Sequence, residues 1–132
     1  MMLAFAAIDW SSQKQKCVAT SSAEAEYIAA SEASKEIVWL RVLFAAFNLT
    51  QDTPTPLFID NQSSIVFMKE PNVTPRRKHI NVRYNHIRSL IKENFIEPVW
   101  VPTAQQLADI FTKPLPRDTF TRMRDLIMGQ RE

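Results

Sequence analysis

Residues 20–30 have the sequence TSSAEAEYIAA and open the longest segment with helical periodicity in the chain. Ser21 or Ser22 is suited to cap a helix, because a serine hydroxyl accepts a hydrogen bond from a backbone N–H of the first turn. Glu24 lies at the capping-box position relative to Ser21. The stretch therefore predicts the start of a long helix, which we expect over about residues 23–47.

Two carboxylates lie in the first turns of this expected helix. Glu26 heads a core-facing stripe with three- and four-residue spacing, which continues through Ala30, Ala33, Ile37, Leu40 and Phe44. Glu24 instead lines up with a mostly polar set, Ile28, Glu32 and Lys35. A carboxylate on a core-facing stripe is costly to bury unless it has a partner or a metal ion. Glu26 is therefore a candidate functional residue.

The composition predicts one small domain, because 132 residues with a hydrophobic fraction of 45% suffice for a core. The single cysteine, Cys17, excludes a disulfide framework within the chain and fits an intracellular, reducing compartment, cytoplasmic or nuclear. No apolar run approaches the ~20 residues of a membrane span, so we expect no membrane partner. The only glycine is Gly129, which argues against P-loop and dinucleotide-binding proteins.

The charges are unevenly placed along the chain. Residues 22–60 contain six acidic and two basic residues, a net charge of −4, whereas residues 69–92 contain seven basic and one acidic residue, a net charge of +6. An acidic block beside a basic block suits a metal site next to a phosphate-binding surface. Two ordinary solvated faces would give the same distribution, and charge alone leaves both interpretations open.

The hydrophobic pattern predicts helices and strands in alternation, as in an α/β protein. Strands are expected over residues 4–10, 57–59 and 95–101. Besides the long helix, helices are expected over about residues 61–68, 82–94, 103–112 and 117–128, with a loop over 70–77. In the last helix but one, Asp109 is expected to face away from the apolar side chains of Leu107, Ile110 and Phe111.

Asp60 directly follows the strand at residues 57–59 and precedes a short helix. Ligand sites of open α/β sheets form at such strand ends, but an aspartate here can also be a plain helix N-cap. Glu26, Asp60 and Asp109 thus lie at element junctions, and carboxylates are the ligands that Mg²⁺ prefers. Their spacing does not by itself establish that they converge.

Several blocks of the sequence resemble a known family. They are WSSQKQK at 10–16, SSAEAEYIA at 21–29, DNQS at 60–63, KHINVRY at 78–84 with HIR at 86–88, and QLADIFTKPLP at 106–116. In this order and approximate spacing they look like the ribonuclease H region of copia-type retrotransposon Pol polyproteins, which carry a reverse transcriptase. The match covers about residues 7–120. The resemblance implies a ribonuclease H-like fold, a mixed sheet flanked by helices, and magnesium-dependent cleavage of the RNA strand of an RNA–DNA hybrid, with Mn²⁺ as an alternative ion.

The family pattern needs four acids, Asp-Glu-Asp-Asp. By resemblance Glu26 matches the glutamate, with Glu24 as the fallback, Asp60 matches the second aspartate and Asp109 the last one. These three are the expected catalytic and metal-binding residues. The residues expected to hold the phosphates of the hybrid are Arg76, Arg77, Lys78 and Arg83.

The first aspartate of the family has no counterpart, because it lies on an opening strand and only nine residues precede Trp10. Asp9 lies where the family has a small polar residue. The sequence therefore resembles a ribonuclease H domain that lacks its first two strands and its first metal ligand, which predicts weak magnesium binding and an inactive isolated chain. A reverse transcriptase domain or another chain would supply the missing strand. A catalytically inactive nucleic-acid-binding remnant and an assembly module that pairs through its exposed sheet edge are the alternatives.

Overall fold

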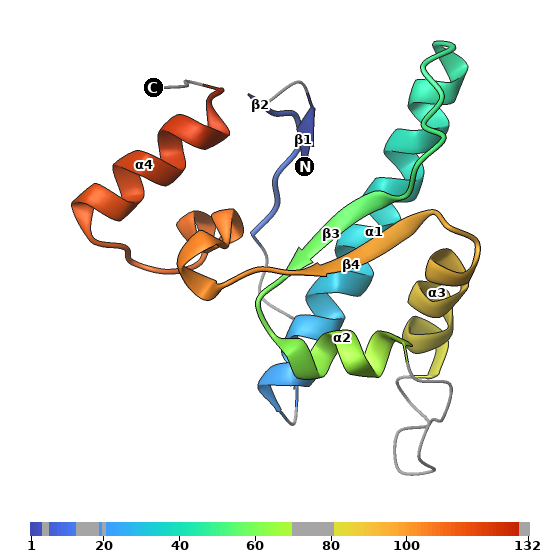
Figure 1. The fold of residues 1–132 in the computed structure, drawn as a ribbon, viewed down its shortest axis with the longest axis horizontal. Helices are drawn as coiled ribbons and strands as arrows, with labels where there is room; N and C mark the ends of the chain where they lie inside the picture. The colour runs from blue at the N-terminus through green and yellow to red at the C-terminus, as the bar shows by residue number, and fades with distance from the viewer. Residues whose placement is uncertain (4–5, 13–18, 20, 70–80, 130–132) are drawn as a thin grey trace. The chain divides into compact units, whose positions relative to one another are not determined.

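The computed structural model describes residues 1–3, 6–12, 19, 21–69 and 81–129 (Figure 1). Within it the chain divides into two contact-rich units, one made of Met1–Lys16 and Ala104–Glu132 and the other of Cys17–Thr103. We call them the terminal unit and the central unit and describe each by itself. A division by contacts does not make two domains, so the single domain stays a prediction.

Helix α1 (Ser22–Ala46) is the longest element of the central unit. Ser21 is its N-cap, and its hydroxyl accepts a hydrogen bond from the Glu24 backbone N–H at 3.1 Å. The helix ends in a turn at Asn48, which adopts a positive φ of 58°. The predicted start and length of this helix are therefore confirmed to within one residue at each end.

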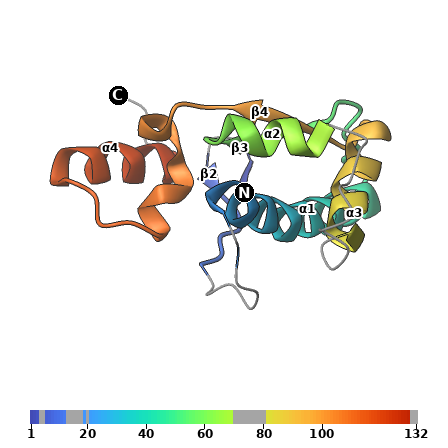
Figure 2. The ribbon, with the colours of Figure 1, turned by 90° about the horizontal axis from the view of Figure 1, so that it is seen from below.

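Strands β3 (Thr55–Ile59) and β4 (Ile96–Trp100) pair in parallel, with Thr55 opposite Ile96 and Ile59 opposite Trp100. Because side chains alternate along a strand, Ile59 and Ile96 are buried on one face, whereas Phe58 and Glu97 are exposed on the other. Figure 2 shows α1 and α3 (Asn81–Lys92) on the same side of this pair. The buried face of the two strands thus packs toward the helices.

Helices α2 (Gln62–Lys69) and α3 lie in the chain between the two parallel strands, which cannot be joined by a tight hairpin. Helices α2 and α3 contact each other, and each also contacts α1 and β4, so they complete the core of the central unit. The apolar side chains buried most completely in this core are Tyr27, Ile37, Ile59, Met68, Ile87 and Ile96.

The terminal unit brings both ends of the chain together. Two-residue strands β1 (Met2–Leu3) and β2 (Ala6–Ala7) pair antiparallel, and β2 contacts α4 (Arg117–Ile127). The Ser12 hydroxyl donates to the Phe111 carbonyl at 3.2 Å. Met123 is the most deeply buried side chain of α4. The first and last segments therefore form one packing unit despite their separation in sequence.

Helices and parallel strands together make this an α/β protein, as expected. Two local predictions were wrong. The strand expected over residues 4–10 is replaced by β1 and β2, with a bend at Ile8. The helix expected over 103–112 is replaced by 3₁₀ helices η2 (Thr103–Gln105) and η3 (Leu107–Phe111), because Gln106 between them adopts an extended ψ of 99°. The predicted loop over 70–77 lies outside the described residues.

Arg41 links the second half of α1 to the amino-terminal ends of both parallel strands. Its guanidinium donates to the Gln51 carbonyl at 2.6 Å, the Thr53 carbonyl at 2.9 Å and the Thr55 hydroxyl at 3.0 Å. It also lies 5.1 Å from the centre of the Phe95 ring, which directly precedes β4. The planar fork of arginine allows this set of contacts, whereas the ammonium of lysine concentrates its donors at one point.

We expect Arg41→Ala to lower the free energy of unfolding by about 2 kcal/mol, because several charge-assisted hydrogen bonds are lost together. Arg41→Lys is the matched control, because it keeps the positive charge but not the planar guanidinium. It should recover less than half of the free energy of unfolding that Arg41→Ala loses. Urea unfolding followed by circular dichroism measures both. Equal stability of Arg41→Ala and the wild-type chain would contradict a role for Arg41 in fixing the strands.

Candidate functional site

Asp60 lies at the carboxyl end of the parallel strand pair, directly after β3, and its side chain is half-buried. The next residue, Asn61, caps α2: its side-chain oxygen accepts hydrogen bonds from the Ser63 and Ser64 backbone N–H groups at 3.0 and 3.3 Å. The alternative interpretation of Asp60 as a plain N-cap is therefore wrong. Asp60 is left at the strand end without a capping role.

The first turn of α2 is tied to the first turn of α1. The fully buried Ser64 hydroxyl donates to the Ala23 carbonyl at 2.9 Å. Asp60 precedes α2, and Glu26 follows Ala23 by about one turn of α1, so the two matched acids come from elements that meet (Figure 1). In the central unit, the carboxyl end of β3 is therefore close to the amino-terminal end of α1.

The two glutamates of α1 differ from their predicted placement. Glu24 is buried, with only 9% of its surface exposed, whereas Glu26 is half-buried. The assignment of Glu24 to a polar side of the helix was wrong, because α1 contacts β3, α2 and α3 and is therefore buried over a wide arc rather than one stripe. Glu24 has the environment of a structural residue, and Glu26 is the more accessible carboxylate.

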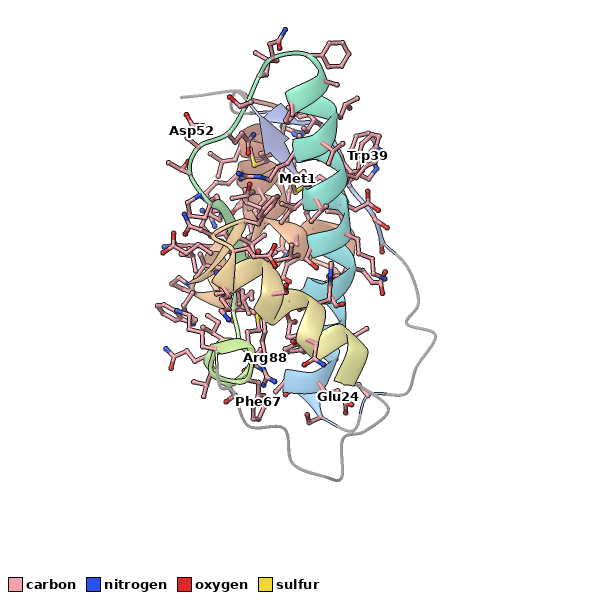
Figure 3. All side chains as sticks on the ribbon, turned by 90° about the vertical axis from the view of Figure 1, so that its right-hand side faces the viewer. Met1, Glu24, Trp39, Asp52, Phe67 and Arg88 are labelled. Atoms are coloured by element: carbon pink, nitrogen blue, oxygen red, sulfur yellow. The ribbon has the colours of Figure 1, made fainter. Side chains whose placement is uncertain are left out.

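Arg88, from the basic block, has a structural contact. One of its terminal nitrogens donates to the Phe67 carbonyl at 3.0 Å, in the last turn of α2, where backbone carbonyls lack helical partners. Figure 3 shows Arg88, Phe67 and Glu24 at the same end of the central unit. Part of the positive charge of the basic block therefore holds α3 to α2.

The structure does not describe the side chains of the four basic residues predicted to bind phosphate. Arg76, Arg77 and Lys78 lie outside the described residues, and the side chain of Arg83 on α3 is outside them too. Their role at the phosphates stays a prediction.

Asp109 is buried on η3, with 8% of its surface exposed. Its Oδ2 atom lies 2.8 Å from the ammonium nitrogen of Lys113, whose side chain is 50% exposed. The prediction that Asp109 faces away from an apolar side was wrong, since it is buried while Phe111 is exposed. In a 3₁₀ helix side chains three residues apart eclipse, which changes the faces expected from a 3.6-residue period.

Lys113 was not among the residues expected at the site. The signal was present, because a lysine four residues after an aspartate has the spacing of a helical ion pair.

Across the described residues, no three His, Cys, Asp or Glu side chains gather in a group that could hold a metal ion. Glu26 and Asp60 belong to the central unit, whereas Asp109 belongs to the terminal unit. The donor types fit Mg²⁺, because all three are carboxylates and Asp60 is not used as a helix cap. The assembly of the three acids into one site stays a prediction.

No helix in the described part of the chain combines the length and apolar character needed to cross a membrane.

The chain is similar to segments of much longer proteins. It is 39% identical over 121 residues to the retrovirus-related Pol polyprotein from transposon TNT 1-94 of Nicotiana tabacum, which covers 92% of this chain and 9% of the relative. It is 37% identical over 113 residues to each of the retrovirus-related Pol polyproteins from transposons RE1 and RE2 of Arabidopsis thaliana, which covers 86% of this chain and 8% of each relative. No family model and no solved structure matches the chain.

We expect Asn61→Ala to lower the free energy of unfolding by about 1 kcal/mol, because the first turn of α2 loses its cap. Asp60→Ala is the matched neighbour and should change stability by less than about 0.5 kcal/mol. Thermal and urea unfolding of the two variants test this. A larger loss for Asp60→Ala than for Asn61→Ala would return the capping role to Asp60.

Proposed function

We propose that this chain is a ribonuclease H-like domain of a copia-type retrotransposon Pol polyprotein. The reaction class is hydrolysis of the RNA strand of an RNA–DNA hybrid. Similarity to Pol polyproteins from three plant transposons supports the origin. The ordered blocks around Glu26, Asp60 and Asp109 support the choice of the ribonuclease H region within such a polyprotein.

One structural observation carries the proposal. The hydrogen bond from Ser64 to Ala23 joins the start of α2, which Asp60 precedes by two residues, to the start of α1, where Glu26 lies. The same end holds the carboxyl termini of two parallel strands, which is where open α/β sheets bind ligands. A nuclease of this class needs acids at such a position.

By resemblance to the family, Glu26, Asp60 and Asp109 would be the residues that hold Mg²⁺, with Mn²⁺ as an alternative ion. The bound ion would supply an activated water and stabilise the leaving oxygen of the phosphodiester. The half-buried positions of Glu26 and Asp60 leave their carboxylates partly accessible from solvent. Arg76, Arg77, Lys78 and Arg83 attract and orient the phosphates of the hybrid through charge, so that binding weakens as salt rises.

These 132 residues supply three of the four acids of the family pattern. We infer that full activity requires a fourth acid, from a preceding segment, a reverse transcriptase domain or another chain. With three carboxylates, the site binds divalent ions less strongly and loses part of the geometry that two ions require. The isolated chain is therefore expected to bind the hybrid and to cleave it poorly.

Cleavage of a labelled RNA–DNA hybrid in magnesium tests the proposal. The substrate is offered to the chain alone and to a version extended by the segment that precedes the matched region in the tobacco polyprotein. We expect the extended chain to cleave the RNA strand, the chain alone to be at least about a hundredfold slower, and Asp60→Asn to abolish cleavage in both. An extended, folded chain that leaves the hybrid intact would favour the binding-only remnant or the assembly module.

The two glutamates of α1 provide a matched pair for the same assay. Glu26→Gln should abolish cleavage by the extended chain and leave its stability unchanged, because the half-buried carboxylate serves the site. Glu24→Gln should keep cleavage and lower the free energy of unfolding by about 1 kcal/mol, because this carboxylate is buried in the first turn of α1. The reverse outcome would make Glu24 the metal ligand.

A further inference from the structure

Lys113 and Asp109 form a local pair whose backbone is fixed by η3. The Asp109 carbonyl accepts hydrogen bonds from the Thr112 N–H at 3.1 Å and the Lys113 N–H at 2.9 Å. The Lys113 ammonium then reaches Asp109 Oδ2 at 2.8 Å. The turn that ends η3 therefore brings the Lys113 ammonium to the Asp109 carboxylate.

The two partners differ in their environment. The Asp109 side chain is only 11% exposed, whereas the Lys113 side chain is 50% exposed. A carboxylate removed from water needs a cation or hydrogen-bond donors, so loss of its partner without replacement is unfavourable. Lys113 keeps access to solvent, so water can hydrate its ammonium when it leaves the carboxylate.

We propose that Lys113 is a positioning residue, the resident counter-ion of Asp109, which a divalent cation must displace. This inference rests on the proposed function, in which Asp109 is a metal ligand. The ammonium and the metal ion would compete for the Asp109 carboxylate, because both supply the positive charge that a buried carboxylate needs. Lys113 holds Asp109 in place in the absence of metal, and it lowers the apparent affinity of the site for the ion.

The competition makes a prediction that a purely structural ion pair does not. Removal of the lysine charge should strengthen metal binding, although it removes a stabilising contact. An ion pair with one half-exposed partner has a modest coupling energy, so the expected gain in affinity is roughly threefold to tenfold.

The test uses Mn²⁺ as the probe and the full chain as the protein. Free Mn²⁺ is measured by electron paramagnetic resonance during titration of the wild-type chain and of Lys113→Met, Lys113→Gln, Lys113→Arg and Asp109→Asn. We expect Lys113→Met and Lys113→Gln to bind Mn²⁺ more tightly than the wild-type chain and Lys113→Arg to bind it equally. Asp109→Asn combined with Lys113→Met should lose the gain. Circular dichroism confirms that each variant is folded.

Thermal unfolding provides a second measurement. In metal-free buffer Lys113→Met should unfold at a lower temperature than the wild-type chain. Saturating Mn²⁺ should raise the unfolding temperature of Lys113→Met by more than it raises that of the wild-type chain. If Asp109→Asn loses Mn²⁺ binding but Lys113→Met binds Mn²⁺ no more tightly than the wild-type chain, the inference about Lys113 is wrong. The proposed metal site would still be supported by that result. Absence of Mn²⁺ binding in every variant would overturn both.

Discussion

The parallel pairing of β3 with β4 is the constraint on which the rest of the central unit depends. Parallel neighbours need a long crossover, and here it contains α2 and α3. The crossover brings both helices against α1, which buries one face of the strand pair and leaves Phe58 and Glu97 exposed on the other. The core residues therefore come from α1, both strands and both helices of the crossover.

Different side chains fix the two ends of the strand pair to the helices. At the amino-terminal end, Arg41 holds the loop before β3 and the residue before β4 to the second half of α1. At the carboxyl end, Asn61 caps α2 and Ser64 ties it to α1. The contacts at the first end are made by one charged side chain, whereas Asn61 and Ser64 are small and neutral.

Burial separates the acidic residues that sequence similarity groups together. Glu24 is nearly as buried as Asp109, but Asp109 forms an ion pair with Lys113, and Glu26, two residues further along α1, is half-buried. The basic block is divided in the same way, because Arg88 serves the end of α2. A count of acidic and basic residues therefore overstates the charge available to a metal ion or to nucleic acid.

Local sequence was sufficient for the long helices and for β3 and β4, because their periodicity and the Ser21 cap depend on neighbouring residues only. It also identified Glu26, Asp60 and Asp109 as candidates, since these acids stand at junctions between elements. The choice between Asp60 and Asn61 as the cap of α2 needed the structure, because both side chains can cap a helix and they are adjacent. The burial of Glu24 and Asp109 needed it as well. Which side of α1 is covered depends on distant elements, and the face of Asp109 depends on the extended backbone at Gln106, which no local periodicity records.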